Sequence, residues 1–143
     1  EPVACHGVVE SALPYLELNG RAIQVRNASD AAVRVLADSE KLRQVLLNVL
    51  LNAVESIETE GEAQVYTEAA GAHVDLVVAD SGRGMSEDER AQMFHPFFTT
   101  KEKGTGLGLA VCQKIIEGHG GEMWADSALG AGTRVYIRLP RAE

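Results

Sequence analysis

Residues 40–57 carry the feature that most restricts how this chain can fold, because their apolar side chains cover nearly the whole circumference of a helix. Ser39 stands where the N-cap of this helix is expected. Leu47 and Leu51 extend the apolar surface around the back. The spacing leaves one narrow polar stripe, formed by Lys41, Gln44, Asn48, Asn52 and Glu55. Such a helix must be covered on most sides, so we expect the rest of the chain to fold around it.

The remaining periodicity predicts two further helices and several short strands. Residues 5–18, kinked at Pro14, and residues 107–117 have helical spacing, whereas residues 83–106 have no convincing period. Strands are expected at 21–27, 32–37, 63–68, 73–79, 122–125 and 133–139, with a hairpin turn near Gly71. Strands in consecutive pairs favour an α+β fold, a two-layer sandwich with a mixed or antiparallel sheet and helices on one face.

Composition limits the classes of function. The 143 residues suit a single domain, and 45% hydrophobic and 24% charged residues are ordinary globular usage. A net charge of −8 disfavours nucleic acid or anionic lipid as a partner. We find no membrane-length apolar run and no leader peptide, so we expect a soluble, cytoplasmic domain. Because the chain begins at Glu1 and not at methionine, we expect a fragment or a processed piece.

Two amides of the polar stripe are candidate metal ligands. Asn48 and Asn52 are four residues apart, so both side chains face the same side of the helix. Their carbonyl oxygens suit a hard cation that keeps part of its water shell, as Mg²⁺ does. Two solvated amides on an exposed helix edge would give the same pattern. The histidines and cysteines, in contrast, have no metal-ligand spacing.

A carboxylate and two glycines follow the apolar segment 73–79. Asp80 would stand at the end of that strand, where Gly82 and Gly84 allow a tight turn and the close approach of a flat ligand. A carboxylate in this place can accept a hydrogen bond from an exocyclic amino group, which is one way to select adenine. Taken alone, the segment is equally compatible with an ordinary turn.

The sequence KGTGLGL at 103–109 opens the expected helix 107–117. Backbone N–H groups freed by glycine at a helix N-terminus form an anion site suited to phosphate. The loop is not a Walker A motif, since no GKS or GKT follows, and Leu109 stands where a dinucleotide fingerprint needs its third glycine. Lys101 and Lys103 flank the loop and would supply positive charge for a triphosphate.

The order of these motifs resembles the catalytic, ATP-binding domain of sensor histidine kinases. The resemblance implies one such domain over residues 1–143, with a Bergerat-type fold and a mixed sheet of about five strands. Gyrase-type topoisomerases, mismatch-repair ATPases and heat-shock chaperones belong to the same fold class. The matching segments are QVLLNVLLNAVESI at 44–57 (N box), DSGRG at 80–84 (first glycine box), MFHPFFTT at 93–100 (F box), GTGLGL at 104–109 (second glycine box) and GAGTRVYIRL at 130–139 (closing strand).

The resemblance also implies roles for single residues. Asn52 would be the main Mg²⁺ ligand with Asn48 assisting, and Asp80 would accept from the adenine amino group with the help of a water molecule. Lys101 matches a basic position near the phosphates, but the segment between the F box and the second glycine box is short. The implied ATP-binding residues are Asn48, Asn52, Asp80, Gly82, Gly84, Met85, Lys101, Gly104, Thr105, Gly106, Leu107, Gly108, Leu109 and Thr133.

The implied activity is delivery of the γ-phosphate of ATP to a histidine on a separate dimerisation and phosphoacceptor domain, with a response regulator further downstream. We expect that domain to be absent from these residues, since His6 is followed by Gly7 where the family has glutamate. We therefore expect no catalytic acceptor in this chain, which should be monomeric and make no contact with nucleic acid or membrane.

Three alternatives remain open: an ATPase of the chaperone or topoisomerase kind, an anti-sigma-type serine kinase, and a nucleotide-binding interaction module that has lost transfer. In the hydrolytic relatives a glutamate stands one turn before the metal asparagine. Asn48 occupies that place here, which weighs against the ATPase.

Overall fold

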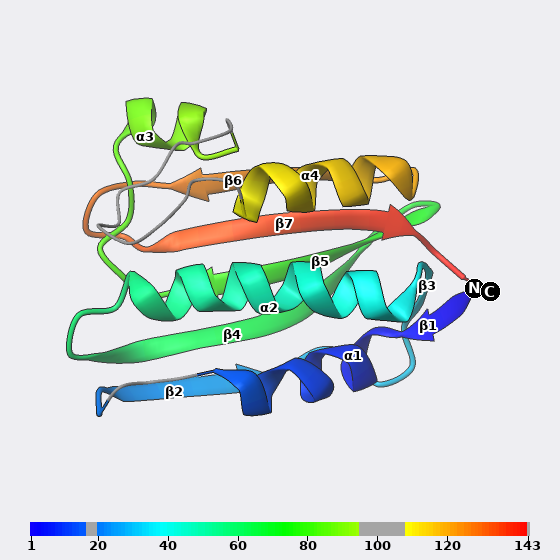
Figure 1. The fold of residues 1–143 in the computed structure, drawn as a ribbon, viewed down its shortest axis with the longest axis horizontal. Coiled ribbons are helices and arrows are strands. Elements are labelled where there is room, and N and C mark those ends of the chain that lie inside the picture. The colour runs from blue at the N-terminus through cyan, green and yellow to red at the C-terminus, as the bar shows by residue number, and fades with distance from the viewer. Residues whose placement is uncertain (17–19, 95–107, 143) are drawn as a thin grey trace.

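A computed structural model describes residues 1–16, 20–94 and 108–142 of the chain. Figure 1 shows two layers, with helices in front of a long sheet. The prediction of an α+β two-layer sandwich is therefore confirmed. In chain order the elements are β1 (Pro2–Ala4), α1 (Cys5–Ala12), the 3₁₀ turn η1 (Leu13–Tyr15), β2 (Ala22–Asn27), β3 (Arg34–Leu36), α2 (Ser39–Glu55), β4 (Glu60–Ala70), β5 (His73–Asp80), α3 (Glu87–Gln92), α4 (Gly108–Gly118), β6 (Glu122–Ser127) and β7 (Thr133–Pro140).

The main sheet has five strands in the order β2-β4-β5-β7-β6. β2 runs parallel to β4, whereas the other neighbouring strands are antiparallel, so the sheet is mixed as expected. β4 and β5 form the expected hairpin, in which Ala70 pairs with His73 beside the turn at Gly71. β1 and β3 form a separate two-stranded sheet.

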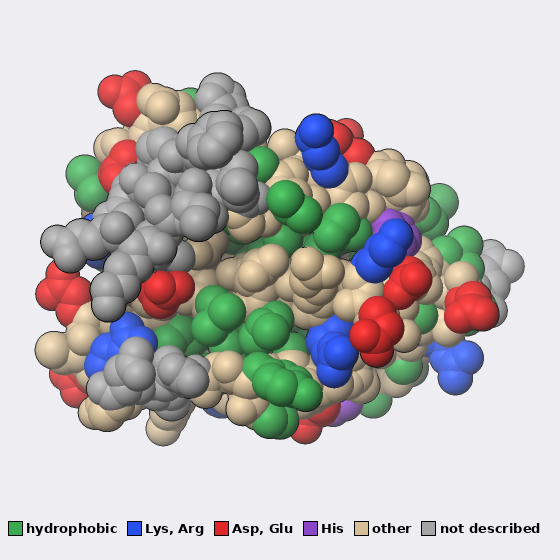
Figure 2. All heavy atoms as spheres, viewed as in Figure 1, with side chains coloured by type: hydrophobic (Ala, Val, Ile, Leu, Met, Phe, Trp, Pro, Cys, Tyr) green, Lys and Arg blue, Asp and Glu red, His purple; other side chains and the backbone are tan. Residues whose placement is uncertain are grey.

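Helix α2 lies across the middle of the sheet, between α1 and α4 (Figure 1). Leu42, Leu46 and Leu50 are almost fully buried against these elements. Burial of each such side chain stabilises the folded state by roughly 1.5–3 kcal/mol. Leu47 and Leu51 remain half-buried. Figure 2 shows hydrophobic side chains reaching the surface in the middle of this face. The helix is thus covered by the sheet and by a helix on each flank, and its fourth side meets the surface.

Several predicted boundaries were wrong in detail. The N-cap of α2 is Asp38, not Ser39, because the Asp38 carboxylate accepts from the N–H groups of Glu40 and Lys41 at 3.0 and 3.1 Å. The first helix ends at Ala12 and does not continue through a kink, since Pro14 lies in a 3₁₀ turn. The predicted strands at 21–27 and 32–37 do not pair with each other. Instead β2 pairs with β4, and β3 pairs with β1.

Two elements were missing from the prediction, β1 and the short helix α3. α3 begins with a capping box, in which Ser86 and Glu89 each accept from the backbone N–H of the other. The sequence Ser-Glu-Asp-Glu carries this signal, although no apolar period follows it.

Strand register decides which side chains face the helices. Ala63, Asp80, Thr133 and Ser127 form one row across β4, β5, β7 and β6. Because side chains alternate between the two faces of a strand, this row points to the same side as Val78 and the other buried residues of the core. The ends of β5, β6 and β7, together with Ala63 near the start of β4, therefore present their side chains toward the helix layer.

The opposite face of the sheet has its own side-chain cluster. The rings of Trp124 and Tyr136 stack with centroids 5.1 Å apart, and the Arg138 guanidinium lies 4.9 Å from the centre of the Trp124 ring. Arg138 also forms a two-bond ion pair with Asp75, at 2.8 and 3.1 Å. No helix of the described ranges is long and apolar enough to cross a membrane.

Candidate functional site

The amide stripe is partly enclosed by α4. Asn48 and Asn52 are half-buried, whereas Lys41, Gln44 and Glu55 at the other positions of the stripe are exposed. The Asn48 amide donates from Nδ2 to the Sγ of Cys112 on α4, at 3.5 Å. The Nδ2 and Oδ1 atoms of the side-chain amide point in different directions. The contact through Nδ2 therefore leaves the Asn48 carbonyl oxygen directed away from Cys112. The stripe is thus a narrow polar strip beside α4.

Asp80 stands at the last position of β5 with its carboxylate half-buried. Oδ1 accepts from the Gly82 N–H at 2.8 Å and from the Ser56 hydroxyl at 3.2 Å. Burial raises the pKa of the Asp80 carboxyl, and these two hydrogen bonds together with one from the backbone of Thr133 oppose that shift. The result is a fixed, partly desolvated acceptor at the end of a strand.

The glycines after Asp80 allow the chain to pass close to its neighbours. Gly84 has a φ of +73°, and a Cβ there would lie 2.0 Å from the carbonyl oxygen of Ala128. Gly82 lies against Ser56, where a Cβ would be 2.0 Å from the hydroxyl oxygen. Both glycines are therefore required by packing within the protein, whatever a ligand demands.

Thr133 and Met85 are joined through Ser127. The Met85 N–H donates to the Ser127 hydroxyl at 2.8 Å, and that hydroxyl lies 2.8 Å from the Thr133 hydroxyl. The Ser127 hydroxyl is also hydrogen-bonded to the Gly132 carbonyl at 3.1 Å. This network ties the loop after β5 to the hairpin between β6 and β7 and keeps Thr133 on the helix side of the sheet.

The structure brings part of the predicted site together. Asp80, Gly82, Gly84, Met85 and Thr133 meet at one end of the sheet, next to the C-terminal end of α2. Gly108 and Leu109 begin α4, with Gly108 exposed and Leu109 packed against the core. The predicted phosphate residues Lys101, Gly104, Thr105, Gly106 and Leu107 lie outside the described residues, as does most of the F box.

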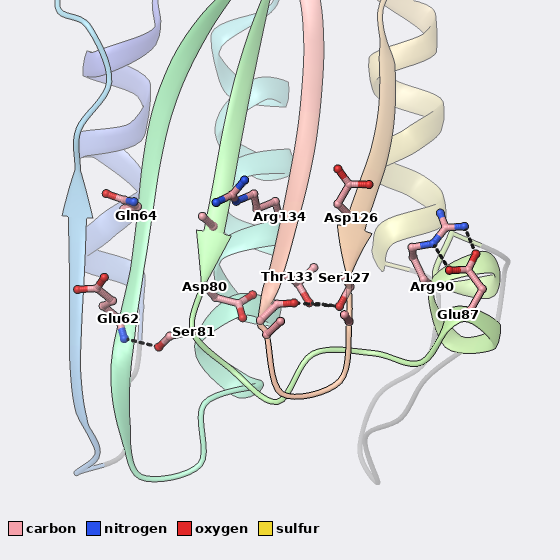
Figure 3. Close-up of a pocket in the computed structure, with 14 residues that line it drawn as sticks. Glu62, Gln64, Asp80, Ser81, Glu87, Arg90, Asp126, Ser127, Thr133 and Arg134 are labelled. Carbon is pink, nitrogen blue, oxygen red and sulfur yellow. Dashed lines mark hydrogen bonds and ion pairs between the residues drawn. The ribbon is translucent and has the colours of Figure 1, made fainter.

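A hollow of about 760 Å³ opens on the other side of this sheet end. Figure 3 shows it from the face without the helices, lined by Gln64, Arg134 and Asp126, with Asp80 and Thr133 at its edge. Neither Asn48 nor Asn52 lines it. The hollow therefore shares Asp80 and Thr133 with the predicted site but includes neither of the two amides. Over the ranges that the structure describes, no cluster of three His, Cys, Asp or Glu side chains could hold a metal ion.

Sequence reasoning missed two serines of this region, Ser56 and Ser127. Ser56 follows Asn52 by four residues, just as Asn52 follows Asn48. The same helical spacing that indicated the amides could therefore have pointed to Ser56. Ser127 carries no comparable signal, because its contacts come from the pairing of β6 with β7.

Comparison with known proteins shows the family of this chain. Residues 37–143 match the family described as histidine kinase-, DNA gyrase B- and HSP90-like ATPases. The chain belongs to this family. Its resemblance to the catalytic domain of sensor histidine kinases is confirmed by both sequence and structural relatives.

The sensor histidine kinase ZraS of Escherichia coli O157:H7 is 44% identical over 125 residues, which are 87% of this chain and 27% of ZraS. The chain thus spans about a quarter of that relative. Full-length ShkA in complex with AMPPNP superposes with a TM-score of 0.87 at 32% identity, covering 99% of this chain and 31% of ShkA. Histidine kinase ThkA, in complex with the response regulator protein TrrA, gives 0.80 at 28% identity, covering 99% of this chain and 42% of ThkA.

Proposed function

We propose that this chain binds Mg-ATP between its sheet and helix layer and delivers the γ-phosphate to a histidine on a separate dimerisation and phosphoacceptor domain. The observation that carries the proposal is the fixed Asp80 carboxylate at the end of β5, joined through Ser56 to the helix that bears Asn48 and Asn52. The acceptor for a base is thereby hydrogen-bonded to the end of the helix that supplies the oxygens for a cation.

The residues fit a magnesium ion by their chemistry. Asn48 and Asn52 offer amide oxygens from successive turns of α2, and the contact of the Asn48 amide nitrogen with Cys112 leaves its oxygen available. When bound, Mg²⁺ would offset the charge of the phosphates. The positive charge of Mg²⁺ and the N–H groups of the loop at 104–109 would together offset the repulsion between a triphosphate and a chain with a net charge of −8.

Each residue would have a defined part in binding. Asp80 accepts from the adenine amino group, while Gly82, Gly84, Met85 and Thr133 form the walls of the base pocket. Lys101 and the backbone of Gly104 to Leu109 hold the phosphates, since N–H groups at a helix N-terminus attract anions. Positioning and charge stabilisation of this kind are the main contributions of a protein to phosphoryl transfer.

The partners follow from the relatives. ShkA was solved with AMPPNP and ThkA with a response regulator protein, and we propose an equivalent nucleotide and, downstream of the acceptor histidine, an equivalent regulator for this chain. The reaction would take place in the cytoplasm, where ATP is present. The chain itself would act as a monomer in contact with the acceptor domain, and would touch neither nucleic acid nor membrane.

A calorimetric titration of the chain with ATP, with and without Mg²⁺, tests the proposal. We expect saturable binding that weakens when Mg²⁺ is removed and in Asn52→Ala. Phosphorylation of an added dimerisation domain by radiolabelled ATP then tests transfer. A folded chain that binds no ATP would contradict the proposal, and binding without transfer to any histidine domain would favour the interaction module or the serine kinase.

A further inference from the structure

Ser56 makes more contacts with the predicted base site than its place at the end of a helix requires. It is the C-cap of α2, and its N–H donates to the Asn52 carbonyl at 3.1 Å. Its carbonyl accepts from the Arg83 N–H at 3.2 Å, and its hydroxyl reaches Asp80 Oδ1 at 3.2 Å. One residue thus fastens the end of α2 to both the beginning and the middle of the loop at 80–84.

The loop is shaped to receive this serine. Gly82 places its own N–H on the same Asp80 oxygen, at 2.8 Å. A Cβ at Gly82 would lie 2.0 Å from the Ser56 hydroxyl oxygen and 2.8 Å from the Ser56 carbonyl oxygen. No larger residue fits between them, so the glycine and the serine are matched, and both hold Oδ1.

The geometry points to Ser56 as a positioning residue for adenine recognition, which it serves by fixing the orientation of the Asp80 carboxylate. This inference rests on the proposed function. With Oδ1 held by two donors, the carboxylate plane cannot rotate freely, and its remaining acceptor capacity keeps one direction. A fixed acceptor favours a base that carries an amino group at that point over one that carries a carbonyl, since the carbonyl would leave the buried acceptor without a donor.

A second serine of the chain, Ser11, provides a matched control for the Ser56 hydroxyl. The single proton of the Ser56 hydroxyl is shared between Asp80 Oδ1 at 3.2 Å and the carbonyl of Ala53, three residues earlier, at 2.7 Å. Ser11 makes the same bond to Val8 at 2.7 Å, on α1. Ser11→Ala therefore removes an equivalent local helix bond without touching Asp80, and separates general loss of a helix bond from loss of the carboxylate contact.

The test is titration of the whole 143-residue chain with Mg-ATP and Mg-GTP, in wild type, Ser56→Ala, Asp80→Asn, the double variant and Ser11→Ala. We expect Ser56→Ala to bind ATP about fivefold to tenfold more weakly with GTP binding unchanged, so that the preference for ATP falls. Ser56→Ala should have no further effect in the Asp80→Asn background, because coupled residues are not additive. Ser11→Ala should bind both nucleotides as the wild type does.

An unchanged preference for ATP in Ser56→Ala, or an equal loss in both backgrounds, would overturn the inference while leaving the proposed function standing. If the wild-type chain binds no ATP, the proposed function and this inference both fall. If thermal melting shows that Ser56→Ala is unfolded, Ser56→Cys repeats the comparison, because a thiol has nearly the same shape and is a weaker donor.

Discussion

The amide of Asn48 donates to the sulfur of Cys112 across 3.5 Å, from the middle of α2 to α4. This contact links the helix that bears both predicted magnesium ligands to the helix that follows the glycine-rich loop. Cys112 is fully buried and free, and burial raises the pKa of its thiol while the Asn48 hydrogen bond lowers it. At neutral pH it is therefore a thiol that serves as an acceptor.

Replacing Cys112 by valine should weaken Mg-ATP binding about twofold to threefold, because the Asn48 amide loses its fixed orientation. Affinity measured without Mg²⁺ should change less. Cys5→Val is the control, since Cys5 is equally buried but lies on α1, away from the amide stripe. Equal changes in the two variants would argue that only packing is involved.

Asp80→Asn should reduce the affinity for ATP at least about tenfold without unfolding the chain, because an amide offers one acceptor where the carboxylate offers two charged oxygens. Calorimetry gives the affinity, and circular dichroism verifies the fold. If Asp80→Asn binds like the wild type, the assignment of base recognition to Asp80 is wrong.

The raised pKa of Asp80 determines how its contributions to fold stability and to ATP binding change with pH. The folded state holds the proton more tightly than the unfolded state, so this group's contribution to stability is present below the unfolded pKa and is lost as the pH rises through the folded pKa. ATP binding should show the opposite trend, weakening on acidification as the carboxylate becomes protonated. NMR titration of the Asp80 carboxyl should give a midpoint above that of an exposed aspartate, and a midpoint at or below it would contradict this reading.

Gly132→Ala should destabilise the chain far more than Gly130→Ala. Both glycines have positive φ, +77° and +79°, so either substitution costs about 1 kcal/mol of backbone strain. At Gly132 a Cβ would also lie 2.1 Å from the Asp80 carbonyl oxygen, whereas at Gly130 nothing lies within 4 Å. We expect a further loss of about 2 kcal/mol or more for Gly132→Ala in urea unfolding. Similar values for both variants would show that the hairpin can move away from β5.

Arg138→Met should lower the melting temperature by about 5 °C or more, because it leaves the buried Asp75 carboxylate without its cation. Arg134→Met, on the same strand and face but exposed, is the control and should change it little. Combining Arg138→Met with Asp75→Asn should restore part of the loss, since the amide needs no counter-charge. Absence of any restoration would assign the effect to the lost stacking of Arg138 on Trp124.

The sequence by itself determined most of the helices and strands and the class of protein. The apolar spacing of residues 40–57 is a property of neighbouring positions, so it predicted α2 and its amide stripe correctly. The hairpin of β4 and β5 and the two-layer arrangement follow from local alternation and turn residues in the same way. The order of the motifs was sufficient to identify the family, because short motifs depend on spacing along the chain.

Tertiary structure alone decided which residues surround Asp80. The parallel pairing of β2 with β4 joins segments far apart in the chain, which local patterns cannot specify. The contact of Ser56 with Asp80 and the approach of Gly132 to the Asp80 carbonyl likewise depend on how α2 and β7 pack against β5. The identity of the amides and the carboxylate is therefore local information, but the orientation of these groups is set by long-range packing.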